Sequence, residues 1–128
     1  MSRNVLDEQI DEEYYIELKR RISIDKVGYG FGRAGMQDEE IRRELHKSGR
    51  TFQTQDQGYY HPKHRHHTYC LVYYDVEDDE LVTYIRRFLR HPQFNTHAKR
   101  RGKIVRVTTQ YIEVWSLKSE NREIIEWN

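Results

Sequence analysis

The strongest constraint on the fold is an apolar and aromatic run of residues 67–75, HTYCLVYYD. In an extended backbone, successive side chains point to opposite faces, and this run has apolar residues in both alternating sets, such as Leu71 and Val72. A strand that is apolar on both faces is usually central in its sheet. We therefore expect this segment to form a central strand.

Helical periodicity is concentrated in the first half of the chain. Ile10, Tyr14, Leu18 and Ile22 recur every four residues and would lie along one face of a helix. A shorter helix is expected to end at Ser48-Gly49, and a third helix is expected to end at His91-Pro92. The predicted helices are Asp7–Ile24, Asp38–Lys47 and a segment that starts at Asp75 or Asp78.

Strand patterns dominate the second half, where apolar residues alternate with polar ones. The predicted strands after the central one are Lys103–Thr109, Gln110–Leu117 and Arg122–Trp127. The polar segment Thr51–Gly58 is expected to be a connection. Helices followed by strands favour an α+β fold. We predict one domain over residues 1–128, in the order α-α-β-α-β-β-β, with N-terminal helices packed on a mostly antiparallel C-terminal sheet of about four strands with one connecting helix.

Residues 28–35, GYGFGRAG, contain the pattern GxGxxG before a predicted helix. A dinucleotide-binding loop needs a preceding strand and a βαβ unit, whereas a helix is predicted here. We expect a flexible loop, since glycine supplies unusual backbone angles. The alternative is a mobile loop that carries aromatic residues and Arg33 and closes over a ligand.

Composition narrows the class of protein. The 128 residues contain one cysteine, Cys70, so no internal disulfide is expected. The acidic first residues lack the apolar stretch of a signal peptide, and no stretch reaches the roughly 20 apolar residues of a membrane span. We expect a cytoplasmic protein that does not insert into membranes.

Charge is distributed unevenly along the chain. Residues 59–110 contain ten Lys and Arg against five Asp and Glu, together with six of the seven histidines. The segments before and after carry a net negative charge. An anionic partner is therefore expected at the middle third.

The stretch HPKHRHH at residues 61–67 has three interpretations. His64 and His66 could ligate a metal, with a third ligand from His61, Asp75 or His97. The two imidazoles could instead cleave RNA without a metal, as general base and acid, while Arg65 stabilises the phosphate. The third interpretation is a basic surface that is solvated or binds phosphate without chemistry.

A second basic run, HAKRRGK, covers residues 97–103 and leads into a predicted strand. If the two strands that follow the basic runs are parallel neighbours, both runs lie at one edge of the sheet. They would then form one cationic surface, on which arginines bind phosphate and tyrosines stack on bases. Its predicted nucleic-acid contacts are Tyr59, Tyr60, Lys63, Lys99, Arg100, Arg101 and Lys103. If the strands are antiparallel, the two runs lie at opposite ends.

The acidic residues between Asp75 and Glu80 lie at a predicted strand end. Carboxylates there could bind magnesium. Helix capping explains the same residues without any function, and it is the interpretation that we favour.

We therefore predict a small intracellular protein that binds RNA or single-stranded DNA, with His64, Arg65 and His66 as candidate catalytic residues of a metal-independent endoribonuclease. No cofactor is predicted. The alternative is a protein-binding inhibitor or accessory subunit, of the kind that phages and mobile elements encode, and a weaker alternative is a metal-stabilised domain. The sequence does not determine whether the chain is an enzyme or whether it forms a homodimer.

Overall fold

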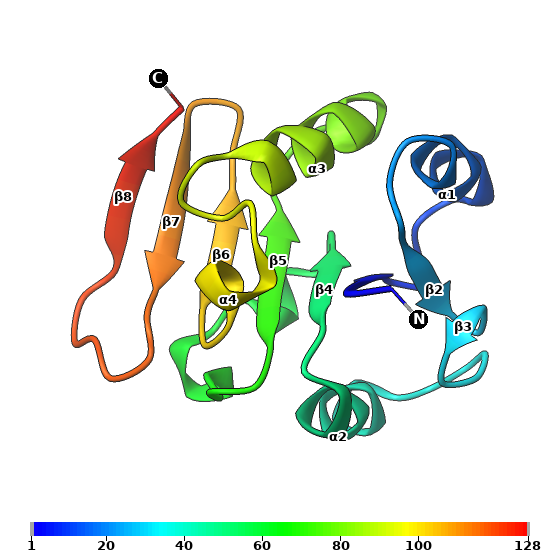
Figure 1. The fold of residues 1–128 in the computed structure, drawn as a ribbon, viewed down its shortest axis with the longest axis horizontal. Helices are drawn as coiled ribbons and strands as arrows, with labels where there is room; N and C mark the ends of the chain where they lie inside the picture. The colour runs from blue at the N-terminus through cyan, green and yellow to red at the C-terminus, as the bar shows by residue number, and fades with distance from the viewer. Residues whose placement is uncertain (1, 128) are drawn as a thin grey trace.

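The computed structural model describes residues 2–127, and its centre is one eight-stranded mixed sheet (Figure 1). The strand order across the sheet is β3-β2-β1-β4-β5-β6-β7-β8. The strands are β1 (Asn4–Leu6), β2 (Asp25–Val27), β3 (Gly30–Phe31), β4 (Thr51–Thr54), β5 (Cys70–Tyr74), β6 (Ile104–Val107), β7 (Tyr111–Trp115) and β8 (Glu123–Glu126).

The six strands from β3 to β6 are mutually parallel, and β7 and β8 continue the sheet in antiparallel pairing. The predicted mostly antiparallel sheet of about four strands is therefore wrong, although the broader α+β class holds. Along the chain the sheet grows outward from β1 to β3 and then from β4 to β8 in the opposite direction.

Helices are interspersed with the strands and do not precede them as a group. They are α1 (Glu12–Lys19), α2 (Asp38–Ser48), α3 (Leu81–Arg90) and α4 (His97–Arg100), with short 3-10 turns η1 (Gln57–Tyr59), η2 (Pro62–His64) and η3 (Asp78–Glu80). None of the helices within residues 2–127 has both the length and the apolar character needed to traverse a lipid bilayer.

Two apolar cores lie on the two faces of the sheet. On one face, α1 and α3 pack through Leu18 and Phe88 against the β5 residues Cys70 and Val72. On the other face, Leu45 of α2 belongs to a core that includes residues of β4 and β5, such as Phe52 and Leu71. The predicted central strand is confirmed, because β5 lies between β4 and β6 and is apolar on both sides.

Three local predictions are wrong. The predicted helix Asp7–Ile24 is helical only over α1, and the residues before and after it lead out of β1 and into β2. The glycine segment is no loop between helices, since it contains β3 and the turn that joins it to β2. The polar segment Thr51–Gly58 contains β4, which lies in the middle of the sheet.

The polar residues of β4 are completely buried, and each has a buried hydrogen-bond partner. Gln53 accepts a hydrogen bond from the Tyr74 hydroxyl at 2.5 Å, and Thr54 donates one to Asp7 at 2.6 Å. Thr51 accepts one from the Arg100 guanidinium at 2.9 Å. Buried polar groups are tolerated when they are hydrogen-bonded in this way.

β5 and β6 are parallel neighbours, with Leu71 opposite Ile104. The two basic runs that precede these strands therefore meet at one edge of the sheet, where the parallel strands begin. A main-chain hydrogen bond joins the second run to the residue just before β5, since Gly102 donates to the Tyr69 carbonyl at 2.8 Å. We call this the amino edge, and the opposite one the carboxyl edge.

Candidate functional site

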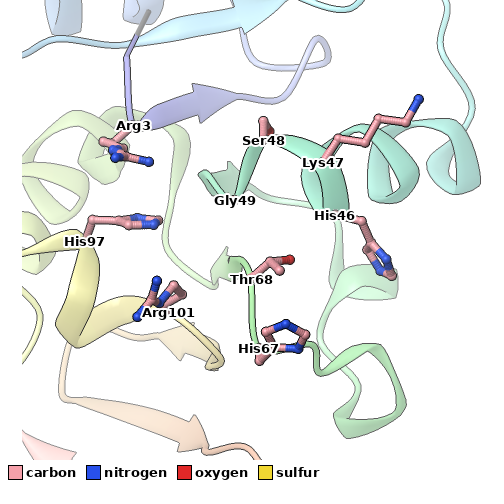
Figure 2. Close-up of a pocket in the computed structure, with 9 residues that line it drawn as sticks. All are labelled: Arg3, His46, Lys47, Ser48, Gly49, His67, Thr68, His97 and Arg101. Carbon is pink, nitrogen blue, oxygen red and sulfur yellow. The ribbon is translucent and has the colours of Figure 1, made fainter.

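A pocket of about 220 Å³ opens at the amino edge (Figure 2). Four parallel strands supply it with the residues that precede them: Arg3 before β1, Gly49 before β4, Thr68 before β5 and Arg101 before β6. We call it the amino-edge pocket. Its lining is Arg3, His46, Lys47, Ser48, Gly49, His67, Thr68, His97 and Arg101.

The lining contains arginine, lysine and histidine but no carboxylate. Arg3 and Arg101 are exposed, and within residues 2–127 neither has a carboxylate in ion-pair distance. Figure 2 shows both on the same side of the pocket as His97, with Gly49 and Thr68 across from them. A concave surface lined by positively charged side chains attracts anions.

His97 has the most unusual environment in the pocket. Its Nδ1 is buried and has no hydrogen-bond partner in the part of the chain that the structure describes. Burial lowers the pKa of His97 below its usual value, and the nearby charges of Arg3, Arg100 and Arg101 lower it further. The pocket therefore disfavours an added proton, as expected where positive potential is unneutralised.

Two members of the pocket have an ordinary structural explanation. His46 and Lys47 lie in the last turn of α2, where basic residues complement the helix dipole. Lys47 also forms an exposed ion pair with Glu44 at 3.6 Å. Arg3 belongs to no helix, and His97 and Arg101 begin and cap α4, a helix of a single turn. These three residues define the site.

Of the predicted catalytic residues, Arg65 forms hydrogen bonds within the protein. Its guanidinium donates to the carbonyls of Pro62 at 2.9 Å, Ser116 at 2.9 Å and Ser119 at 2.6 Å, and it lies 5.6 Å above the ring of Trp115. These contacts tie the loop before β5 to the β7–β8 connection. Arg65 therefore has a structural role.

The structure does not bring His64 and His66 together on a common face. The His66 ring stacks on His46 at 3.9 Å and on His67 at 4.5 Å, whereas His64 has its ring 6.2 Å from His61. Burial lowers the pKa of both His64 and His66. The reason for their separation is η2, which turns the chain where an extended backbone would have aligned them.

Tyr59 cannot stack on a base as predicted, because only 1% of it is exposed and its hydroxyl donates to Asp38 at 2.8 Å. Tyr60 is half-buried and donates to Glu113 at 2.8 Å. Burial raises the pKa of both tyrosines, so both stay protonated donors at neutral pH.

Among the predicted phosphate contacts, only Arg101 lines the amino-edge pocket. Arg100 is buried. Lys99 donates to the Pro92 carbonyl at 2.7 Å, and Lys103 donates to the Lys99 carbonyl at 2.7 Å, so both close the segment around α4. Lys63 is exposed and lies outside the pocket.

The sequence interpretation did not include Arg3, His46, Lys47 and Thr68. Arg3 precedes a strand of three residues, which is too short to show a period. His97 and Arg101 carried a usable signal, since side chains four residues apart share one side of a helical turn.

Neither metal interpretation finds a ligand set. Within residues 2–127, no group of three or more His, Cys, Asp or Glu side chains is arranged to hold a metal ion. In the acidic segment, Asp75 pairs with Arg106, and Glu77 and Glu80 form a capping box at η3. These contacts agree with helix capping.

The carboxyl edge, where open parallel sheets usually bind ligands, is acidic. Asp7, Asp56 and Asp75 follow β1, β4 and β5 there. Asp7 is buried, which raises its pKa, and it accepts the hydrogen bond from Thr54. Two of these carboxylates therefore have partners within the protein, Asp75 in Arg106 and Asp7 in Thr54.

Comparison of the chain with known protein families, curated proteins and solved structures finds no match.

Proposed function

We propose that the protein binds nucleic acid, either RNA or single-stranded DNA, through phosphates held at the amino-edge pocket. The observation that carries the proposal is that Arg3, before β1, and His97 and Arg101, at α4, converge on one pocket whose lining contains no carboxylate. The guanidinium fork matches the oxygens of a phosphate.

The difference between the two edges supports the same proposal. The exposed arginines of the amino edge have no carboxylate partner within residues 2–127, whereas the carboxyl edge carries Asp7, Asp56 and Asp75, of which Asp75 pairs with Arg106. A flexible single strand fits a concave pocket better than a stiff duplex does, because it can follow the curvature of the surface.

The test is a titration of fluorescently labelled single-stranded RNA and DNA with the wild type and the Arg3→Gln/Arg101→Gln variant. We expect the variant to bind more weakly and the slope of log affinity against log salt to become about 1.4 shallower, since each phosphate contact on a single strand contributes roughly 0.7. Arg33→Gln/Arg43→Gln is the matched control, because both arginines are exposed and neither lines the amino-edge pocket.

If the wild type fails to bind either oligonucleotide at low salt, the proposal is wrong. The protein-binding alternative then becomes the better hypothesis, and co-purification of a stable protein partner without nucleic acid would support it.

A second candidate activity is metal-independent RNA cleavage, favoured by the presence of His67 and His97 in the same pocket as Arg101. One neutral imidazole would take the proton of a 2′-hydroxyl, whose oxygen attacks the phosphorus and forms a 2′,3′-cyclic phosphate. The other, protonated, imidazole would give its proton to the departing 5′-oxygen, while the guanidinium stabilises the phosphorane.

Labelled RNA incubated with the protein and a chelator tests this activity. Cleavage products should end in a cyclic phosphate, and they should disappear when His97→Gln replaces the wild type or when the substrate lacks 2′-hydroxyls. RNA that is bound but stays intact would leave binding as the function.

A further inference from the structure

A second basic pocket, of about 400 Å³, lies between the ends of α1 and α3. Its cationic walls are Arg21, which follows α1, and Arg86 and Arg90 of α3. Arg100 and the side-chain amides of Asn4 and Asn95 complete its polar lining, which contains no carboxylate. We call it the α1–α3 pocket.

Arg100 is the most deeply buried cation of this pocket. Only 5% of it is exposed, and its guanidinium donates to Thr51 at 2.9 Å and to the Phe94 carbonyl at 2.8 Å. Within residues 2–127 no carboxylate lies in ion-pair distance, and its Nη2 has no hydrogen-bond partner. A buried charge without a counter-ion is costly, so this arrangement favours a bound anion.

The other arginines of the pocket are less informative when taken singly. Arg21 and Arg90 lie near the carboxyl ends of helices, where cations complement the helix dipole. Their position around Arg100 is what matters. An anion that neutralises the buried guanidinium of Arg100 would also contact the exposed guanidinium groups beside it.

Consecutive residues of the chain line the two basic pockets. Arg3 lines the amino-edge pocket and its neighbour Asn4 lines the α1–α3 pocket. Likewise Arg101 lines the first and Arg100 the second. At two points in the sequence, beside β1 and before β6, a residue that lines one pocket is therefore followed or preceded directly by a residue that lines the other.

We infer that the α1–α3 pocket binds a second phosphate of the same nucleic-acid strand whose neighbouring phosphate lies in the amino-edge pocket, so that one strand crosses the amino edge of the sheet. This inference rests on the proposed function. It adds a second subsite and a footprint of more than one nucleotide. Asn95 has a side-chain N–H to offer to a sugar or base, since Lys99 occupies its carbonyl oxygen at 3.0 Å.

The test compares Arg86→Gln/Arg90→Gln with the wild type on labelled oligo-U and oligo-dT of 2, 4, 8 and 12 nucleotides, lengths of about the site size of small single-strand-binding folds. Neither substitution touches the hydrogen bonds of Arg100. The longer oligonucleotides should bind on the order of 10-fold more weakly to the variant at low salt, whereas the shortest, which fills one pocket, should change least. Arg21→Gln, on the other wall, should weaken the long oligonucleotides in the same way. Oligo-U and oligo-dT separate RNA from DNA as the preferred strand.

The variants separate the failure of this inference from that of the proposed function. If Arg3→Gln/Arg101→Gln weakens binding and Arg86→Gln/Arg90→Gln binds like the Arg33→Gln/Arg43→Gln control, the second subsite is refuted and the proposed function stands. If only the α3 variant weakens binding, no strand spans both pockets and the inference is also wrong. If the wild type binds no oligonucleotide, the proposed function itself fails. Thermal unfolding of each variant checks that the fold is retained.

Discussion

We expect pH to change the charge of the amino-edge pocket through the protonation of His97. Its pKa is lowered by burial and by the charges of Arg3, Arg100 and Arg101. In the unfolded chain the imidazole has its ordinary pKa and takes up a proton first as the pH falls, so protonation favours unfolding. A bound phosphate reverses this preference, because it stabilises the imidazolium.

We therefore expect two opposite pH dependences. Without nucleic acid, the free energy of unfolding should fall as the pH drops below about 6.5, whereas oligonucleotide affinity should rise. His97→Gln should reduce both slopes; part of the stability slope should persist, since the pKa values of His64, His66 and His91 are also lowered. Thermal unfolding and fluorescence titration between pH 7.5 and 5.5 measure them. Profiles that do not change in His97→Gln would contradict this assignment.

At the residue scale, the sequence predicted where cations lie in the chain but not which ones the fold uses. Arg65 and Arg101 lie in comparable basic runs, yet three main-chain carbonyls accept hydrogen bonds from Arg65 while Arg101 is exposed at a pocket. The acceptors of Arg65 include Ser116 and Ser119, about fifty residues away in sequence. Local pattern carries no information about such partners.

At the scale of elements, predictability followed length and apolar pattern. β5, β6 and β7 each have four or five residues with clear apolar positions, and all were predicted. β1 and β3 have three and two residues, and no period can be recognised in so short a segment. β4 was missed for another reason: its polar residues are buried by partners such as Arg100 and Tyr74 that only the folded chain supplies.

Gly49 shows how an element boundary shapes the pocket. It ends α2 with a φ of 66°, and an added Cβ would lie 2.9 Å from the carbonyl oxygen of Thr68, which also lines the pocket. A left-handed backbone costs a residue with a Cβ about 1–2 kcal/mol, and here the contact with the β5 side adds to that cost.

Gly49→Ala should therefore destabilise the protein by at least about 1–2 kcal/mol in chemical denaturation. Gly35→Ala is the matched control, since Gly35 has a φ of 80° and nothing lies within 4 Å of its added Cβ. The control should show only the backbone cost. Equal destabilisation of the two variants would mean that the approach of Gly49 to Thr68 contributes no strain.

At the scale of the whole molecule, the parallel order of β1, β4, β5 and β6 separates charge between the two edges of the sheet. Segments that precede these strands supply Arg3 and Arg101, whereas Asp7, Asp56 and Asp75 follow β1, β4 and β5. The sequence alone left the relative direction of β5 and β6 open, and the position of the basic runs depended on it. Their parallel pairing is therefore the link between the charge pattern and a candidate site.

The free edge of β8 is one place where two copies of the chain could pair through their sheets. β8 is an outer strand with one paired side, and its exposed residues include Glu123, Ile124 and Glu126, with Ile124 half exposed. Charged residues on an edge strand oppose pairing with a second copy. Glu123→Thr/Glu126→Thr should have a larger average mass than the wild type as concentration rises, which sedimentation or light scattering can measure. Glu13→Thr/Glu17→Thr removes the same charge from exposed positions of α1 and should leave the mass unchanged. If both variants associate equally, net charge and not the β8 edge keeps the copies apart.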